Sequence, residues 1–139
     1  MARSDPFVEA LAAVPLFSAC SKRELQTVAK RVDHVSAPEG KVLVTEGAAG
    51  AEFFVILEGR ARVVRHGRQV ATLGPGGFFG DLALLDRAPR NASVVADTPM
   101  DLAKLNQRGF DELLEVPGFS KKLLAGLARR LREADARTL

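Results

Sequence analysis

The middle of the chain, residues 32–106, is divided into short apolar runs by glycine and proline. Apolar and polar residues alternate within these runs, most clearly in 60–65 (RARVVR), as is typical of strands with one solvent-facing side. Many short strands joined by tight turns favour a sandwich or a barrel. We expect about eight strands, at 32–37, 41–45, 52–58, 60–66, 69–73, 78–80, 92–97 and 100–106.

Helical periodicity flanks this region on both sides. Residues 5–13 carry apolar side chains at helical spacing behind a proline start signal. Ser21 and Glu24 form a capping box at the start of a second amphipathic helix, over 21–32. After the strands we expect a short helix that ends near Pro117, and then a longer amphipathic helix over 119–135.

The 139 residues fit a single domain, 1–139. It would consist of an N-terminal helical piece (1–31), a β region (32–106) and C-terminal helices (107–139). Hydrophobic residues make up 47% of the chain, which is enough for a core. The sequence therefore predicts a mainly β fold with flanking helices.

Composition narrows the cellular setting. The net charge of +3 is spread along the chain and does not require a nucleic-acid partner. The single cysteine, Cys20, excludes an internal disulfide and fits a reducing cytoplasm. Arg3 is not followed by an apolar signal region, and no apolar run approaches the ~20 residues that span a bilayer. We expect a bacterial, cytoplasmic protein that does not contact membranes.

The sequence offers little to catalysis or to metal binding. A metal-binding barrel would need several histidines and a carboxylate, whereas this chain has only His34 and His66. No nucleophile is paired with a base, and no carboxylate pair is placed for acid–base chemistry. We expect both histidines to be polar surface residues, with no metal site and no catalytic residue.

Residues 76–96, GGFFGDLALLDRAPRNASVVA, have the features of an anion site. Their glycines let the backbone approach a ligand closely. Asp81 can cap a short helix over 82–85, whose free N–H groups would attract an anion. Arg90 follows Pro89 and can clamp a phosphate with two parallel hydrogen bonds. An ordinary loop with a solvated arginine is the alternative.

Taken together, these residues resemble the phosphate-binding cassette of cyclic nucleotide-binding domains. That family includes the catabolite activator protein, the regulatory subunits of cyclic-AMP-dependent kinase and cyclic-nucleotide-gated channels. Its pattern is Phe-Gly-Glu, an apolar run, and then Pro-Arg followed by small residues. Phe79–Gly80, Leu82–Leu84, Pro89–Arg90 and Ala92–Ser93 match it in order and without a gap. The resemblance implies a β-jelly-roll barrel in which the cassette, 78–94, lies between late strands.

The resemblance also assigns roles within the cassette. Arg90 would pair with the cyclic phosphate, and the backbone N–H groups of Leu82 and Ala83 would donate to its other oxygens. Gly80 and Asp81 would face the ribose. The family usually has glutamate where this chain has Asp81, whose side chain is one methylene shorter.

Four further positions bear on phosphate and base. Asn91 stands where family members carry Ser, Thr or Ala near both groups. Its amide could contact guanine as well as phosphate, so cyclic AMP and cyclic GMP both stay open. Ser93 would also lie near the base, with Val63 and Leu73 as apolar wall residues.

The function implied is that of a non-catalytic sensor of cyclic AMP or cyclic GMP, with no cofactor besides this ligand. It would signal to a protein effector in trans through movement of its C-terminal helix. No helix-turn-helix follows that helix, so we expect no direct DNA contact unless the chain is a fragment. Alternatively, the fold serves as an interaction module that binds no nucleotide and forms a homodimer through the C-terminal helix. Asp81 favours this alternative, and the intact Pro89–Arg90 pair opposes it.

Overall fold

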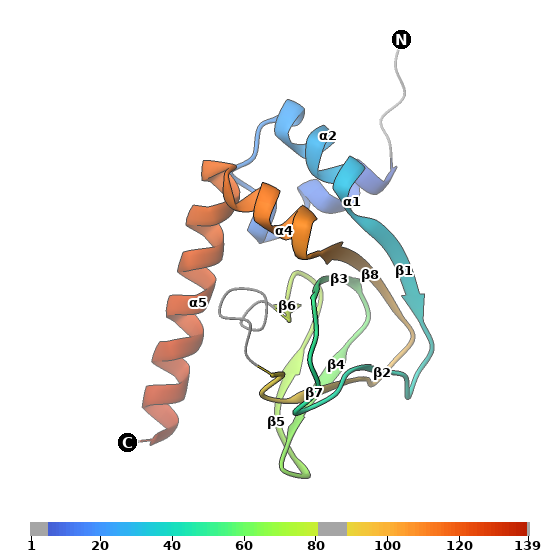
Figure 1. Cartoon of the computed structure of the whole chain (residues 1–139), viewed down its shortest axis with the longest axis vertical. Coiled ribbons are helices and arrows are strands. Elements are labelled where there is room, and N and C mark those ends of the chain that lie inside the picture. The colour runs from blue at the N-terminus through green and yellow to red at the C-terminus, as the bar shows by residue number, and fades with distance from the viewer. Residues whose placement is uncertain (1–5, 81–88, 139) are drawn as a thin grey trace.

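The computed structural model describes residues 6–80 and 89–138, with side chains as far as 133. In this part of the chain eight strands form two antiparallel four-stranded sheets, which Figure 1 shows beside the helices. The first sheet has the order β1-β8-β3-β6 and the second β2-β7-β4-β5. The strands are β1 (Asp33–Ala37), β2 (Val42–Val44), β3 (Glu52–Glu58), β4 (Ala61–Arg65), β5 (Arg68–Leu73), β6 (Phe78–Phe79), β7 (Ser93–Ala96) and β8 (Met100–Asn106).

The prediction of a mainly β fold with flanking helices is confirmed, and each observed strand lies within two residues of its expected bounds. The expected barrel is not closed. Strands pair only within their own sheet in the described part of the chain, so the two sheets face each other as separate layers. Strand periodicity predicts which segments are strands and which of their sides face solvent. It does not predict whether the edge strands of the sheets pair and close a barrel.

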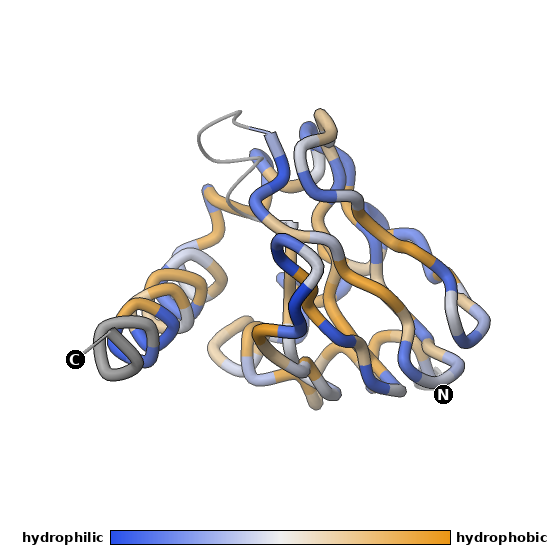
Figure 2. Tube along the Cα trace, turned by 90° about the horizontal axis from the view of Figure 1, so that it is seen from below, coloured by the Kyte–Doolittle hydropathy of each residue, from blue (hydrophilic) through white to orange (hydrophobic). Residues whose placement is uncertain are grey.

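Helices flank the sheets at both ends of the chain. They are α1 (Pro6–Ala12), the 3-10 turn η1 (Pro15–Phe17), α2 (Lys22–Arg31), α4 (Gln107–Leu114) and α5 (Pro117–Thr138). Viewed from below in Figure 2, α5 stands to one side of the strands. Within the described residues, no helix combines the length and the apolar character needed to cross a bilayer.

Local signals explain where these helices begin. The capping box before α2 is confirmed: the Glu24 N–H donates to Ser21 Oγ at 3.1 Å, and the Ser21 N–H donates to Glu24 Oε1 at 2.7 Å. The last helix begins at Pro117 rather than at residue 119 and has 22 residues. Proline fits the first turn of a helix because its missing N–H would have no partner there.

The first sheet is buried on both faces. One face packs against the helices in a core that includes Phe53, Phe78 and Phe110. The other packs against the second sheet in a core that includes Phe54 and Phe79. Consecutive side chains of a strand point to opposite faces, so neighbouring phenylalanines enter different cores.

An ion-pair cluster links the turn between β7 and β8 to the start of β4. Asp97 Oδ2 accepts from Arg60 Nε and Asp97 Oδ1 accepts from Arg62 Nη1, both at 3.1 Å. The hydrogen bond from Arg60 is the main cause that lowers the pKa of the Asp97 carboxyl below its usual value. The ionised carboxylate therefore stabilises the folded chain.

We expect Asp97→Asn to lower the midpoint of urea unfolding at pH 7. A lowered pKa means that the contribution is complete above the usual carboxyl range and is lost as pH falls through the folded value. The gap between variant and wild type should thus stay constant down to about pH 5 and shrink below about pH 4. Urea titrations across this range, with Glu115→Gln as an exposed control, test the expectation. A gap of equal size at every pH would contradict it.

Candidate functional site

The side chain of Arg90 is buried, with only 6% of the residue exposed. Its Nη1 donates to the Gly80 carbonyl oxygen at 3.1 Å, and its Nη2 donates to the Glu52 carbonyl oxygen at 3.0 Å. Two residues that the sequence predicted as ligand contacts, Arg90 and Gly80, are thus in direct contact. The alternative of a solvated surface arginine is wrong, because the guanidinium is held inside the fold.

The turn between β2 and β3 holds the backbone of Arg90. The Gly47 N–H donates to the Arg90 carbonyl at 2.7 Å, and the Arg90 N–H donates to the Ala48 carbonyl at 2.9 Å. A Cβ on Gly50 would collide with the guanidinium. Sequence reasoning treated these glycines only as a strand break and missed their role. Two glycines within four residues (GAAG) are the signal that could have indicated a close approach.

Gly80 occupies a position that a larger residue would disturb. Its φ is +88°, in the left-handed region that favours glycine. A Cβ there would collide with the Glu52 carbonyl oxygen and would lie 2.8 Å from Arg90 Nη1. The absence of a side chain lets the strand end, the guanidinium and β3 come together.

The other predicted ligand contacts that the structure describes lie on or beside the second sheet, or are exposed after Arg90. Ser93 begins β7, and its Oγ accepts from the Glu46 N–H at 2.9 Å, which ties β7 to the β2–β3 turn. Asn91 is exposed. Val63 and Leu73 are half-buried and pack against the core between the two sheets.

Three predicted residues, Asp81, Leu82 and Ala83, lie outside the described residues, as does the short helix expected to start there. Their roles at the ribose and the phosphate stay predictions.

The last helix docks on the strand that leads into Gly80. Arg130 of α5 donates to the Phe78 carbonyl oxygen, and its guanidinium carbon lies 4.2 Å from the centre of the Phe78 ring. A Cβ on Gly126 would lie 2.8 Å from Phe78 Cζ, so glycine permits this close approach. Sequence reasoning missed this contact, since nothing in the local pattern of α5 identifies its distant neighbour.

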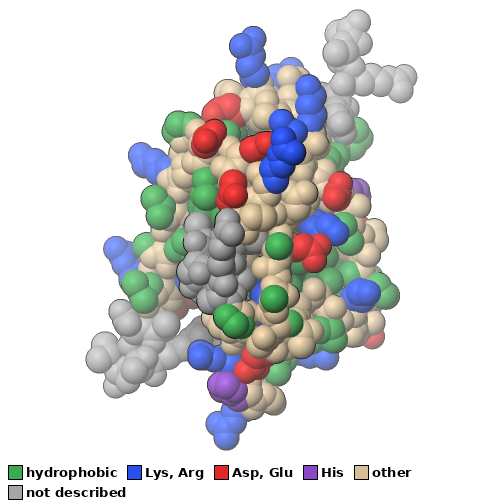
Figure 3. Space-filling view, in the orientation of Figure 1, with side chains coloured by type: hydrophobic (Ala, Val, Ile, Leu, Met, Phe, Trp, Pro, Cys, Tyr) green, Lys and Arg blue, Asp and Glu red, His purple; other side chains and the backbone are tan. Residues whose placement is uncertain are grey.

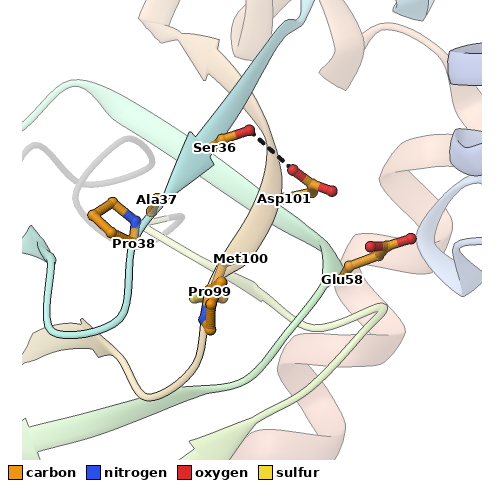
Figure 4. A pocket seen from close by; sticks show the side chains of 7 residues that line it. All are labelled: Ser36, Ala37, Pro38, Glu58, Pro99, Met100 and Asp101. Atoms are coloured by element: carbon orange, nitrogen blue, oxygen red, sulfur yellow. Dashed lines mark hydrogen bonds between the residues drawn. The ribbon is translucent and has the colours of Figure 1, made fainter.

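A pocket of about 390 Å³ lies at a different place (Figure 4). Its lining consists of Ser36, Ala37, Pro38, Glu58, Pro99, Met100 and Asp101. Ser36 Oγ donates to Asp101 Oδ1 at 3.0 Å. Glu58 ends β3, whereas the Glu52 carbonyl that holds Arg90 begins it, so the two places are about 20 Å apart along the strand. The pocket is therefore not part of the Arg90 site.

Both histidines lie beside carboxylates. His34 Nε2 lies 3.6 Å from Asp101, and His66 Nδ1 lies 3.0 Å from Glu46. Burial is the main cause that raises the pKa of the Cys20 thiol, so the reactive thiolate is disfavoured. Among the residues that the structure describes, no three His, Cys, Asp or Glu side chains gather in a way that could hold a metal ion.

Known proteins share the sequence pattern and the fold of this chain. The family model "Cyclic nucleotide-binding domain" matches residues 34–116. The chain belongs to this family. It is 38% identical over 103 residues to a cAMP-dependent protein kinase regulatory subunit of Aspergillus niger, a match that covers 73% of this chain and 25% of that subunit. The chain thus spans about a quarter of the length of the curated relatives it matches.

Two solved structures extend the comparison across almost the whole chain. The catabolite activator protein of Thermus thermophilus is 34% identical with a TM-score of 0.80, covering 89% of this chain and 61% of that one. The regulatory subunit of a cAMP-independent protein kinase A from Trypanosoma brucei is 26% identical with a TM-score of 0.83, covering 96% of this chain and 48% of that one. The cyclic nucleotide-binding fold is therefore shared beyond residues 34–116, which the family model matches.

We expect Gly80→Ala to destabilise the chain more than Gly40→Ala does. Both glycines have a left-handed φ, near +88° and +87°, but a Cβ on Gly40 would meet no atom within 4 Å. Gly40→Ala should therefore cost only the backbone strain, about 1–2 kcal/mol, and Gly80→Ala should cost at least about 1 kcal/mol more. Urea unfolding of the two variants measures the difference. Equal losses would show that the approach of Gly80 to Glu52 is not tight.

Proposed function

We propose that this chain binds a cyclic nucleotide beside Arg90 and Gly80 and catalyses no reaction. The observation that carries the proposal is the buried guanidinium of Arg90, which two backbone carbonyls hold next to the cassette glycine. Cyclic AMP is the first candidate, because the curated relatives are named as regulatory subunits of cAMP-dependent kinase. The bacterial origin and the cytoplasmic location expected from the sequence stay predictions.

The state of Arg90 favours binding of an anion. A guanidinium that is already positioned by the backbone loses little rotamer freedom when a ligand arrives. Its burial places it where the dielectric is lower than in water, and charge-assisted hydrogen bonds to phosphate are strong in such surroundings. In this proposal, the N–H groups of Leu82 and Ala83 donate to the other phosphate oxygens, and Asp81 accepts from the ribose.

The base would be chosen by residues around Asn91. This side chain is exposed directly after Arg90, so its amide is available to a ligand at the same site. Val63, Leu73 and Ser93 are half-buried and would form the wall that faces the base. The T. brucei relative belongs to a cAMP-independent kinase, so the shared fold does not identify the ligand and cyclic GMP must be compared directly.

We expect Arg90→Ala to weaken cyclic AMP binding at least tenfold. Removing one member of a buried charge pair costs about 2–5 kcal/mol, and Arg90→Lys should recover only part of this because lysine lacks the planar fork. Isothermal titration of protein freed of bound nucleotide, with cyclic AMP and then cyclic GMP, measures both effects. Arg65→Ala removes an exposed arginine of β4 and serves as the matched control. A folded Arg90→Ala variant that binds like wild type would remove Arg90 from the site.

Signalling would pass from the cassette to α5. Phe78 contacts Arg130 and Gly126 of α5, and it lies two residues before Gly80. A nucleotide that shifts the Gly80 end of β6 would alter this docking contact. The ligand acts as a signal only if it favours one of two positions of α5 by differential affinity.

We expect cyclic AMP to change the hydrogen-exchange protection of amides in α5, while those of α2 stay as they were. Arg130→Leu should raise exchange in α5 without ligand, because the bond to the Phe78 carbonyl is lost. Exchange followed by mass spectrometry, with and without saturating nucleotide, gives both readings. Identical protection in α5 of the wild type would leave a passive binder.

The second candidate is a module for protein association that binds no nucleotide. Asp81 in place of the family glutamate favours it, and in this case the two carbonyl bonds of Arg90 serve only to brace the fold. The same titration separates the candidates. Absence of heat with both nucleotides, on folded and ligand-free protein, would support this module.

A further inference from the structure

The outer side of α5 is a second feature of this helix that the nucleotide site does not use. The helix has 22 residues and is therefore about 33 Å long. Phe119 and Leu123 on its inner side are buried in the helical core, and Leu127 packs against that core. The residues treated below point away from this side.

Two leucines on this helix are exposed to an unusual degree. Leu124 is 66% exposed and Leu131 is 64% exposed. They are seven residues apart, so they lie on one face two turns from each other, and the exposed Ala128 lies between them. These three residues form a narrow apolar strip along the helix.

A basic strip runs directly beside the apolar one. It consists of the exposed side chains of Lys121, Lys122, Arg129 and Arg132. At 100° per residue these four fall within an arc of about 100° that begins next to Ala128. Glu133 lies at the edge of the arc that is farthest from the leucines. Figure 3 shows basic and apolar side chains together along the edge of the molecule that α5 forms.

We propose that this face of α5 docks an acidic amphipathic helix of a partner protein. The leucine strip would pack against the apolar positions of that helix, and Lys121 and Arg132, the two cations nearest to the leucines, would face its carboxylates. The pattern matches helix pairs in which an apolar seam provides contact area and flanking charges choose the partner. In this proposal a protein effector engages this face, which lies on a different side of α5 from the contacts of Arg130 and Gly126 with Phe78.

Charge and composition argue against the other occupants. A second copy of the chain would bring two sets of these cations close together, and like charges across an interface are unfavourable. A membrane-surface helix usually inserts a broad apolar face with aromatic residues, whereas the exposed apolar strip here holds two leucines and an alanine. A phosphate backbone would pair with the cations but would leave the leucines in water.

The probe is a labelled synthetic peptide of about 21 residues, in three heptads with Leu at a and d and Glu at e and g. A matched peptide carries Lys at e and g. Fluorescence anisotropy with the intact chain should show saturable binding of the acidic peptide only, weakened by salt. Leu124→Ser together with Leu131→Ser should weaken binding at least about tenfold, since each loses apolar contact.

Matched charge reversals make the test specific to this face. Lys121→Glu with Arg132→Glu reverses the two cations nearest to the leucines and should abolish binding of the acidic peptide. Arg65→Glu with Arg68→Glu makes the same change in net charge on the β4–β5 hairpin and should leave binding intact. All these positions are exposed, so thermal unfolding should confirm that each variant folds.

Several outcomes would overturn the proposal. They are no binding of the acidic peptide, equal loss with both charge reversals, or tighter binding of phosphatidylserine vesicles or duplex DNA through the same residues. A wild-type dimer in sedimentation that Leu124→Ser disperses would assign the face to a second copy. Cyclic AMP titration of the Lys121→Glu, Arg132→Glu variant keeps the two proposals apart, because failure of one leaves the other readable.

Discussion

The first sheet has to satisfy two cores at once, and the rest of the structure depends on this constraint. Phe53 and Phe78 enter the core under the helices, with ring centres 5.9 Å apart. Phe54 and Phe79 stack at 4.9 Å in the core between the sheets. Phe53 and Phe54 are consecutive on β3, and Phe78 and Phe79 are consecutive on β6, so neither core can repack without disturbing both strands. Gly80 directly follows β6 and closely approaches the carbonyl of Glu52, the first residue of β3.

This arrangement explains how the guanidinium of Arg90 is held in one position. The guanidinium of Arg90 is fixed by carbonyls from β3 and from the end of β6, and its backbone is fixed by the turn at 47–50. Close packing of the sheet thus sets the position of the cation, at distances where a Cβ on Gly50 or Gly80 would intrude. The stability of the core and the geometry of the site have the same origin.

Local patterns in the sequence predicted more of the fold than of the site. The strand positions, the Ser21 cap and the importance of Arg90 and Gly80 follow from periodicity, capping chemistry and the cassette resemblance. The role of Gly50 and the docking of Arg130 on Phe78 could not be predicted, because they depend on which distant segments meet. The expected barrel came from the family resemblance, and alternation could not correct it because alternation specifies the faces of a strand and not the partner of an edge.

In the two proposals, the two faces of α5 would give the helix a role that neither face would have alone. One face touches Phe78, two residues from Gly80, and another presents Leu124, Leu131 and the basic strip. If nucleotide binding changes how α5 docks, it changes the affinity for a partner that prefers one docked position. By reciprocity, that partner must change the affinity for the nucleotide by the same factor. Such couplings are typically about 1–3 kcal/mol. A partner that binds both positions equally well would leave the nucleotide equilibrium unchanged however tightly it bound. The effect of a partner on nucleotide affinity would therefore depend on how differently it binds the two positions of α5, and not on how tightly it binds the outer face.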